Sequence, residues 1–104
     1  MHFIKLQSEY DDLDKYKFYD GHIMYYKKGT SIFHNPYGPA IISKDGTEQY
    51  WVENKIHRLD GPAVIYRDGE EKYFINSEYL TEEQFEVHPE RLKFLGKEYL
   101  LCIV

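Results

Sequence analysis

The chain has 104 residues, enough for one small domain, and its net charge at pH 7 is −5. This acidic balance argues against nucleic-acid phosphate or an anionic lipid surface as the main partner. The single cysteine, Cys102, excludes a disulfide within the chain. No apolar run is long enough for a membrane span, so the cytoplasm is the expected compartment.

Residues 1–15 are predicted to form an N-terminal cap on the rest of the chain. Residues 2–6 alternate weakly between apolar and polar side chains, as a short strand does. Ser8 is placed to begin a helical turn, with Asp11 reaching back to its start. The acidic stretch up to Lys15 lacks the spacing and the distal glutamate of a calcium loop, so it is interpreted as a solvated turn.

The middle of the chain, residues 16–80, is built from a repeat. A His-containing stretch that ends in Gly-Pro-Ala is followed by Asp-Gly and then by a pair of aromatic residues. Two copies are clear, at an offset of 23 residues: 34–40 with 57–63, Asp45-Gly46 with Asp68-Gly69, and 50–52 with 73–75. A degenerate earlier copy contains Asp20-Gly21 and Tyr25-Tyr26 at an offset of 25, so its two extra residues fall in the connection over 27–33.

Each clear copy is predicted to be a β-hairpin that turns at its Asp-Gly pair. Strands over 39–44 and 47–53 flank the first pair, and strands over 62–67 and 70–76 flank the second. Asp-Gly favours a two-residue type I′ turn, in which both residues have positive φ. The resulting register places Ile41 opposite Tyr50, Ala40 opposite Trp51, Val64 opposite Tyr73 and Ala63 opposite Phe74.

Residues 81–104 are predicted to form a helical C-terminal cap that closes the repeat sheet. Thr81 and Gln84 have the spacing of a capping box, which predicts a helix beginning near Thr81. Pro89 is a suitable first residue for a second short helix, which runs through Leu95 and is ended by Gly96. The apolar residues over 97–104 predict a short terminal strand.

The repeat resembles the MORN family, whose unit is also a hairpin of about this length. The closest likeness is to a variant with His-Arg-x-Asp-Gly-Pro-Ala, then Asp-Gly, then Tyr-Trp, familiar from small proteins of bacteriophages and large DNA viruses. Residues 57–63 match this pattern well, whereas Asn35 and Tyr37 replace the Arg and the Asp in the earlier copy. The resemblance implies a mainly β fold, an open antiparallel sheet of MORN-like hairpins used for interaction, and it assigns no catalytic activity to particular residues.

Ten residues are assigned to turns and none to catalysis or metal binding. His34 and His57 are expected to order the connections between units, since no Cys or His lies near them at a metal-motif spacing. Arg58 and Asp60 are expected to hold the following Gly-Pro turn through a charge-assisted hydrogen bond. The turn residues are His34, Asp45, Gly46, His57, Arg58, Asp60, Gly61, Pro62, Asp68 and Gly69.

Large aromatic side chains are the candidates for partner binding. Both faces of the predicted hairpins carry apolar residues, so at least one face needs a cover or a partner. Tyr and Trp are typical anchors of protein interfaces. The candidates are Tyr50, Trp51, Tyr66, Tyr73 and Phe74.

The sequence favours a non-enzymatic module that binds a protein, without a cofactor, nucleic acid or membrane. A phage protein that binds or inhibits a host defence factor, in the host cytoplasm, is one specific form of this hypothesis. Association into a homo-oligomer stays open. The alternatives are an acidic mimic of nucleic acid that blocks a DNA- or RNA-binding protein, and a small hydrolase or nuclease. Neither a nucleophile motif nor a phosphate-binding glycine loop supports the last of these.

Overall fold

A computed structural model describes residues 2–97 and 100 and shows a mainly β fold, as predicted. Eight strands form an open antiparallel sheet in the order β1-β2-β3-β4-β5-β8-β9-β10, and β6 and β7 form a separate small hairpin. The sheet strands are β1 (Phe3–Leu6), β2 (Leu13–Phe18), β3 (Ile23–Lys27), β4 (Ile41–Ile42), β5 (Glu48–Gln49), β8 (Val64–Ile65), β9 (Glu71–Ile75) and β10 (Glu78–Leu80). The other elements are β6 (Trp51–Val52), β7 (Lys55–Ile56), α1 (Glu82–Glu86) and α2 (Pro89–Phe94).

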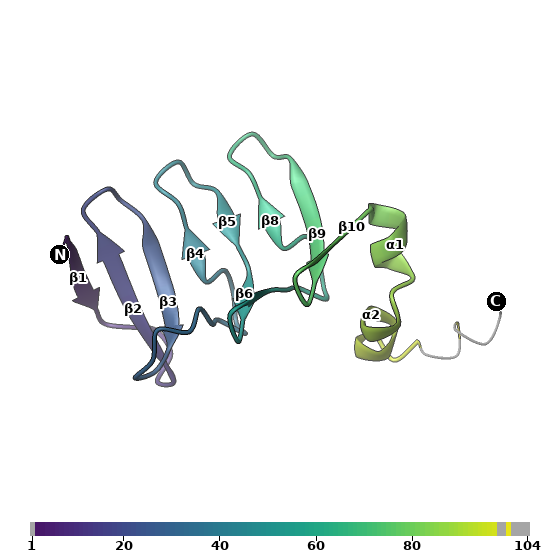
Figure 1. Cartoon of the computed structure of the whole chain (residues 1–104), viewed down its shortest axis with the longest axis horizontal. Coiled ribbons are helices and arrows are strands. Elements are labelled where there is room, and N and C mark those ends of the chain that lie inside the picture. Colours follow the sequence, from purple (N-terminus) through teal and green to yellow (C-terminus); the bar gives the residue numbers. More distant parts are fainter. Residues whose placement is uncertain (1, 98–99, 101–104) are drawn as a thin grey trace.

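The molecule is elongated, with extents of 53 × 30 × 19 Å. The strands lie side by side in nearly the order of the chain, with β1 at one end and the two helices at the other (Figure 1). Both helices begin where the sequence predicts them, and Thr81 forms the expected capping box with Gln84. The predicted terminal strand over 97–104 falls almost entirely outside the described residues.

The prediction of type I′ turns at the Asp-Gly pairs is wrong. Gly46 and Gly69 have φ of 95° and 91°, but neither Asp45 nor Asp68 has positive φ. The hydrogen bonds from Ser43 N–H to the Thr47 carbonyl and from Gly46 N–H to the Ser43 carbonyl define a type I turn followed by a glycine bulge. The cause is the Asp45 carboxylate, which accepts the Thr47 N–H and keeps Asp45 in the right-handed region.

The extra residue in each bulge moves the strand register by one. Ile41 pairs with Gln49 and Val64 pairs with Lys72, so neither faces the tyrosine that was predicted opposite it. Small residues still alternate with large ones across the sheet, but the large ones are tyrosines. Backbone hydrogen bonds and register place these side chains in a row in the order Tyr25, Ala40, Tyr50, Ala63 and Tyr73.

The type I′ turns lie at the opposite ends of the hairpins, where the sequence analysis placed no turn. Glu53 and Asn54 have φ of 50° and 65°, and Asn76 and Ser77 have φ of 50° and 68°. In the degenerate first copy a longer turn takes the place of the two-residue turn. The hydrogen bond from Lys27 N–H to the Ile32 carbonyl closes this longer turn. The two extra residues of that copy therefore fall within the 27–33 connection, as predicted.

The N-terminal segment differs from its prediction at two points. Residues 8–11 form no helix; instead, Tyr10 N–H bonds to the Ser8 hydroxyl and the chain makes a turn. Asp14 belongs to β2 and is buried rather than solvated. Its carboxylate accepts the Gly29 N–H at 2.9 Å, and this hydrogen bond holds the pKa of Asp14 below its usual value.

One face of the sheet is covered at both ends, and it holds the two clusters of buried side chains. Near the N-terminus, Tyr10 packs over the buried side chains of Leu13, Tyr25 and Ala40. Near the C-terminus, Phe85 of α1 packs over Ile75 and Leu80. The strand register places Tyr25, Ile42, Ile65 and Tyr73 on the same side, so both covers lie on one face. We call this the covered face. The opposite side, which also carries the buried side chains of Ile41 and Val64, we call the bare face.

Candidate interaction surface

Six aromatic rings form a continuous row on the bare face. Consecutive ring centroids are 5.0–5.6 Å apart, within the range of favourable aromatic contacts. All six side chains are half-buried, so each is fixed by its neighbours while keeping one side open. We call this row the aromatic ladder; in order, it contains Phe18, Phe3, Tyr16, Tyr26, Phe33 and Trp51.

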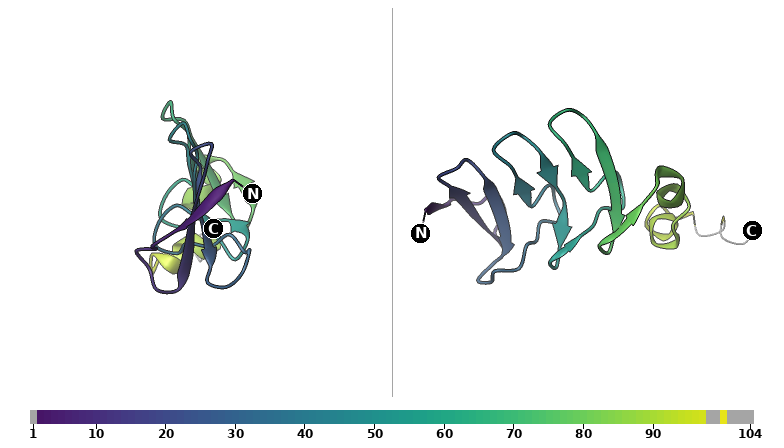
Figure 2. Two further views of the ribbon diagram at one scale, coloured as in Figure 1. Left: turned by 90° about the vertical axis from the view of Figure 1, so that its left-hand side faces the viewer. Right: turned by 45° about the horizontal axis from the view of Figure 1, so that its top comes forward.

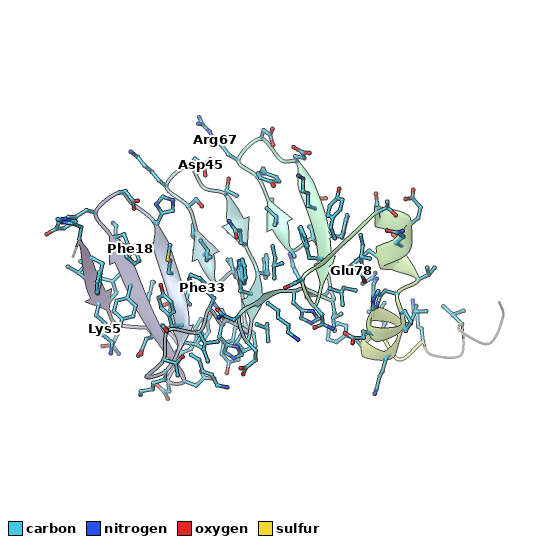
Figure 3. The ribbon with its side chains drawn as sticks, in the orientation of Figure 1. Lys5, Phe18, Phe33, Asp45, Arg67 and Glu78 are labelled. Atoms are coloured by element: carbon cyan, nitrogen blue, oxygen red, sulfur yellow. The ribbon has the colours of Figure 1, made fainter. Side chains whose placement is uncertain are left out.

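Strand pairing between distant segments brings these rings together. Phe3 pairs with Phe18 across β1 and β2, and the isolated bridge between Tyr26 and Phe33 continues the row beyond β3. Trp51 then contacts Phe33 at 5.6 Å. In Figure 3, Phe18 and Phe33 lie on different parts of the sheet, at β2 and after β3. The ladder therefore runs across several strands instead of along one.

A second, smaller aromatic group lies on the same face toward the C-terminus. The rings of Phe74 and Tyr79 are 5.3 Å apart, and the Lys72 ammonium lies 5.4 Å from the Tyr66 ring and 6.0 Å from the Tyr79 ring. Tyr79 is 60% exposed. Phe74 stands one repeat after Trp51, so this group is the counterpart of the end of the ladder in the next unit.

The five partner-binding candidates divide between the two faces. Tyr66 and Phe74 lie on the bare face, and Trp51 contacts Phe33 there while also packing against the buried cluster of Leu13, Tyr25 and Ala40. Tyr50 lies under the Arg58 guanidinium, and Tyr73 packs against Phe85, so both belong to the covered face. The sequence analysis missed five ladder residues, although the alternation within β2 could have revealed two of them; the missed residues are Phe3, Tyr16, Phe18, Tyr26 and Phe33.

His34 and His57 make the same contact in successive units. His34 Nδ1 accepts the Glu53 N–H at 3.0 Å, and His57 Nδ1 accepts the Asn76 N–H at 3.0 Å. Each accepted N–H belongs to a residue of the type I′ turn at the end of the following strand. Because Nδ1 is the acceptor, the neutral imidazole carries its proton on Nε2. These contacts join each connection to the neighbouring hairpin.

Arg58 and Asn35 make the same contact with different side chains. Arg58 Nη1 donates to the Pro62 carbonyl at 3.1 Å, and Asn35 Nδ2 donates to the Pro39 carbonyl at 3.0 Å. Arg58 also donates from Nε to Asp60 at 2.9 Å, and its guanidinium lies 4.0 Å from the Tyr50 ring centroid. The replacement of Arg by Asn between the copies thus preserves the bond that closes the Gly-Pro turn.

Arg58→Ala is expected to lower stability more than Asp60→Ala. The arginine loses the carbonyl bond, the ion pair and the contact with Tyr50, which together correspond to about 1–2 kcal/mol. Asp60 is exposed and has only the ion pair, so its loss should cost about 0–1 kcal/mol. Urea denaturation of both variants measures this order, and a larger loss for Asp60→Ala would contradict it. We expect both variants to keep partner binding.

The stability of the protein is expected to fall as the pH decreases through about 6.5, partly because of His57. Burial lowers the pKa of His57 below its usual 6.5, so the unfolded chain takes up the proton at a higher pH than the folded chain does. The contribution of neutral His57 is therefore present above pH 6.5 and is lost as the pH falls through the folded pKa. Protonation also removes the Nδ1 acceptor for the Asn76 N–H.

The measurement for His57 is the free energy of unfolding at about pH 7.5 and about pH 5.5. His57→Asn is the matched variant, because an amide oxygen can accept the Asn76 N–H but does not titrate. We expect a smaller difference between the two pH values in this variant than in the wild-type protein. An equal difference would show that His57 does not contribute to the pH dependence.

The charges of the chain are unevenly distributed along its length. Residues 67–90 carry eight carboxylates against two cations, and they include β9, β10 and α1. Glu71, Glu82 and Glu86 are close enough to Tyr73 to contribute, after burial, to raising the pKa of its hydroxyl. The segment from β9 to α1 is therefore the acidic part of the molecule, whereas α2 after it carries Arg91 and Lys93 in its last turn.

Comparisons with protein families, curated proteins and solved structures give no match for this chain. Within residues 2–97 and 100, no three His, Cys, Asp or Glu side chains are grouped so that they could hold a metal ion. None of the described helices has the length and apolar character needed to cross a membrane. What the chain binds is therefore inferred from its surface.

Proposed function

We propose that this chain is a non-enzymatic, cytoplasmic module that binds a protein through its bare face. The observation that carries the proposal is the aromatic ladder, six half-buried rings in contact on the side of the sheet opposite the two covers. Large aromatic side chains contribute most of the energy of many protein interfaces. Their arrangement here supports an interface instead of a solvent-facing surface.

The ladder is also ordered before a partner arrives. Each ring contacts one or two others, so docking a partner on them should restrict few additional rotamers. Binding surfaces that are already ordered lose less entropy on association, which favours affinity for a given buried area. This supports a rigid docking platform, in keeping with the single-layer sheet that presents it.

The likeness of the repeat to MORN-like viral proteins suggests a more specific form of this function. In that form, the chain is a bacteriophage protein that binds or inhibits a host factor inside the host cell. The support for it is the unit at 57–63 with its following Asp-Gly and aromatic pair. In both clear copies the two strands of a hairpin are joined by a turn at the Asp-Gly pair, as expected for a hairpin repeat.

Acidic mimicry of nucleic acid is the second candidate function. The observation that favours it is the excess of carboxylates over residues 67–90, at the end of the molecule away from most of the ladder. A mimic would present these carboxylates to a basic groove on its partner. The two candidates thus use different parts of the molecule and can be separated by mutation and by salt.

The test compares proteins captured from a host lysate by the wild-type chain and by matched variants. Tyr16→Ala and Phe33→Ala remove ladder rings, and Tyr19→Ala removes a ring that is 78% exposed on a turn and outside the ladder. We expect a captured protein to be lost at least tenfold with the ladder variants, to be kept with Tyr19→Ala, and to change little between about 0.05 and 0.5 M salt. Circular dichroism confirms that each variant is folded.

Two results would contradict the ladder as the binding surface. One is capture that survives both ladder variants. The other is capture that is lost at high salt and on changing Glu82 and Glu86 to Gln, because a screened, carboxylate-dependent interaction is what mimicry predicts.

A further inference from the structure

The outer edge of the sheet at β1 offers unpaired backbone groups. β1 pairs only with β2, and no described strand lies on its other side (Figure 2). The His2 carbonyl accepts the Tyr19 N–H, which places His2 in a hydrogen-bonded pair with β2. Hydrogen-bonded and non-bonded pairs alternate along an antiparallel ladder, so the N–H and C=O groups of Phe3 and Lys5 point outward. They can receive another strand.

A hollow lies beside this edge on the bare face, at the start of the aromatic ladder. Its volume is about 250 Å³, and its lining is largely aromatic, with a small polar rim from Thr30 and Ser31. Phe3 borders the hollow and also provides one of the outward-facing backbone pairs. Alternate side chains of a strand added next to β1 would lie on this face, where apolar groups fit.

The covered face of the same edge has a different character. Ile4 is 52% exposed, and its neighbours on β2 are Lys17, directly opposite, and Lys15, opposite Leu6. Lys15 is paired with Glu9 at 3.1 Å, whereas Lys17 is exposed and makes no ion pair with any residue that the structure describes. The remaining side chains of an added strand would lie directly beside Ile4 and Leu6 of β1, and a carboxylate among them can extend over Ile4 toward the exposed Lys17 ammonium on β2.

We propose that β1 receives an extended segment of a partner protein that alternates apolar and acidic residues, and that this segment extends the sheet by one strand. This inference rests on the proposed function and names the kind of segment that the partner contributes. The backbone groups of Phe3 and Lys5 supply main-chain hydrogen bonds, and the two faces of the edge select the side chains. The apolar side chains contact the ladder at Phe3, and the acidic ones lie near Lys17 on the opposite face.

A second copy of this chain fits the edge less well. Pairing two β1 strands antiparallel brings two Lys17 side chains, and no carboxylate of β1 or β2 other than the buried Asp14, to the shared edge. The contact between two four-residue strands is also short compared with the roughly 1,200–2,000 Å² that stable interfaces bury. A partner with carboxylates provides what the second copy lacks.

The test uses a blocked peptide of alternating Val and Glu, labelled with a fluorophore, and measures its binding by fluorescence anisotropy. Lys5→Pro removes an outward N–H without removing a bond of the β1–β2 ladder, and Lys5→Ala is its matched control because both lose the ion pair with Asp14. We expect the peptide to bind Lys5→Pro at least tenfold more weakly than Lys5→Ala. A peptide with Lys in place of Glu should bind the wild-type chain at least tenfold more weakly, and Lys17→Glu should reverse this preference.

A second measurement keeps the test decisive if Lys5→Pro does not fold. Methylating the peptide's own backbone nitrogens removes its donors, and this should abolish binding to the wild-type chain if a strand is added. Equal binding of the methylated peptide, or equal binding of the Lys peptide, would overturn the inference. A concentration-dependent dimer that Lys5→Pro dissociates would also overturn it, because the edge would then belong to a second copy.

These outcomes are separate from those of the lysate capture. Loss of a captured protein with Tyr16→Ala and Phe33→Ala, together with no effect of Lys5→Pro on either capture or peptide binding, would keep the bare face as the binding surface and reject strand addition. The opposite result is peptide binding that depends on Lys5 and Lys17, with capture that is unchanged in Tyr16→Ala and Phe33→Ala. It would support strand addition at β1 and reject the proposed function of the bare face.

Discussion

Phe85→Ala is expected to lower the free energy of unfolding by about 3–5 kcal/mol, the largest effect of any single change considered for this chain. Phe85 is 3% exposed and packs with Ile75 and Leu80. Its ring lies 4.6 Å from that of Tyr73 and 4.5 Å from the Arg91 guanidinium. Helix α1 has only five residues and cannot persist without this contact. The C-terminal cap should therefore detach from the sheet.

Thermal unfolding followed by circular dichroism measures this effect. For a domain of this size the expected loss corresponds to a fall in melting temperature of more than about 10 °C. Val87→Ala is the control, because Val87 closes the same helix but is 65% exposed, and its loss should change stability by less than about 0.5 kcal/mol. Equal effects of the two substitutions would show that Phe85 does not anchor the cap.

Gly46→Val and Gly69→Val are each expected to lower stability by more than about 1 kcal/mol, and up to about 3 kcal/mol. Both glycines have φ near 90°, a conformation that a β-branched residue resists. No atom lies within 4 Å of the position that a Cβ would occupy at either glycine, so a clash cannot account for the loss. The loss would therefore measure the cost of the backbone conformation in the bulge.

Gly38→Ala is the matched control for these turns. Gly38 does not have positive φ, and the nearest atom to a Cβ placed there is Asn35 Nδ2 at 3.9 Å, an ordinary contact. This variant should be as stable as the wild-type protein within about 0.5 kcal/mol, or slightly more stable. Urea denaturation of all three variants makes the comparison. If Gly69→Val were as stable as the wild-type protein, the bulge could change its turn type at little cost in free energy.

The hairpins could be predicted because the repeat fixes where the chain turns. The type of turn could not, because Asp-Gly suits a type I′ turn as well as a type I turn with a glycine bulge. In each unit the aspartate carboxylate accepts the N–H of the residue two positions on, and this bond decides between the two turn types; in the last copy the Glu70 N–H donates to Asp68. The turns at Glu53-Asn54 and Asn76-Ser77 were missed because neither contains glycine, the usual sign of positive φ.

The aromatic ladder depends on pairing between segments that are distant in the sequence. β2 was hidden because Asp14 and its acidic neighbours suggested a solvated turn, whereas Asp14 is buried in β2 and accepts the Gly29 N–H. Without β2, the pairing of Phe3 with Phe18 cannot be deduced. By contrast, Trp51 and Phe74 could be identified as candidates, because the repeat itself places aromatic residues at those positions.

The row of alternating tyrosines and alanines limits how the length of the chain can change. Each alanine leaves room for the tyrosines beside it, so a whole unit such as residues 57–79 could be duplicated with every neighbour preserved. Adding one residue inside a strand would instead turn its following side chains to the other face. The two extra residues of the first copy lie in the turn over 27–33, outside this row. That turn is therefore the place where an inserted tag or a lengthened loop should leave the sheet intact.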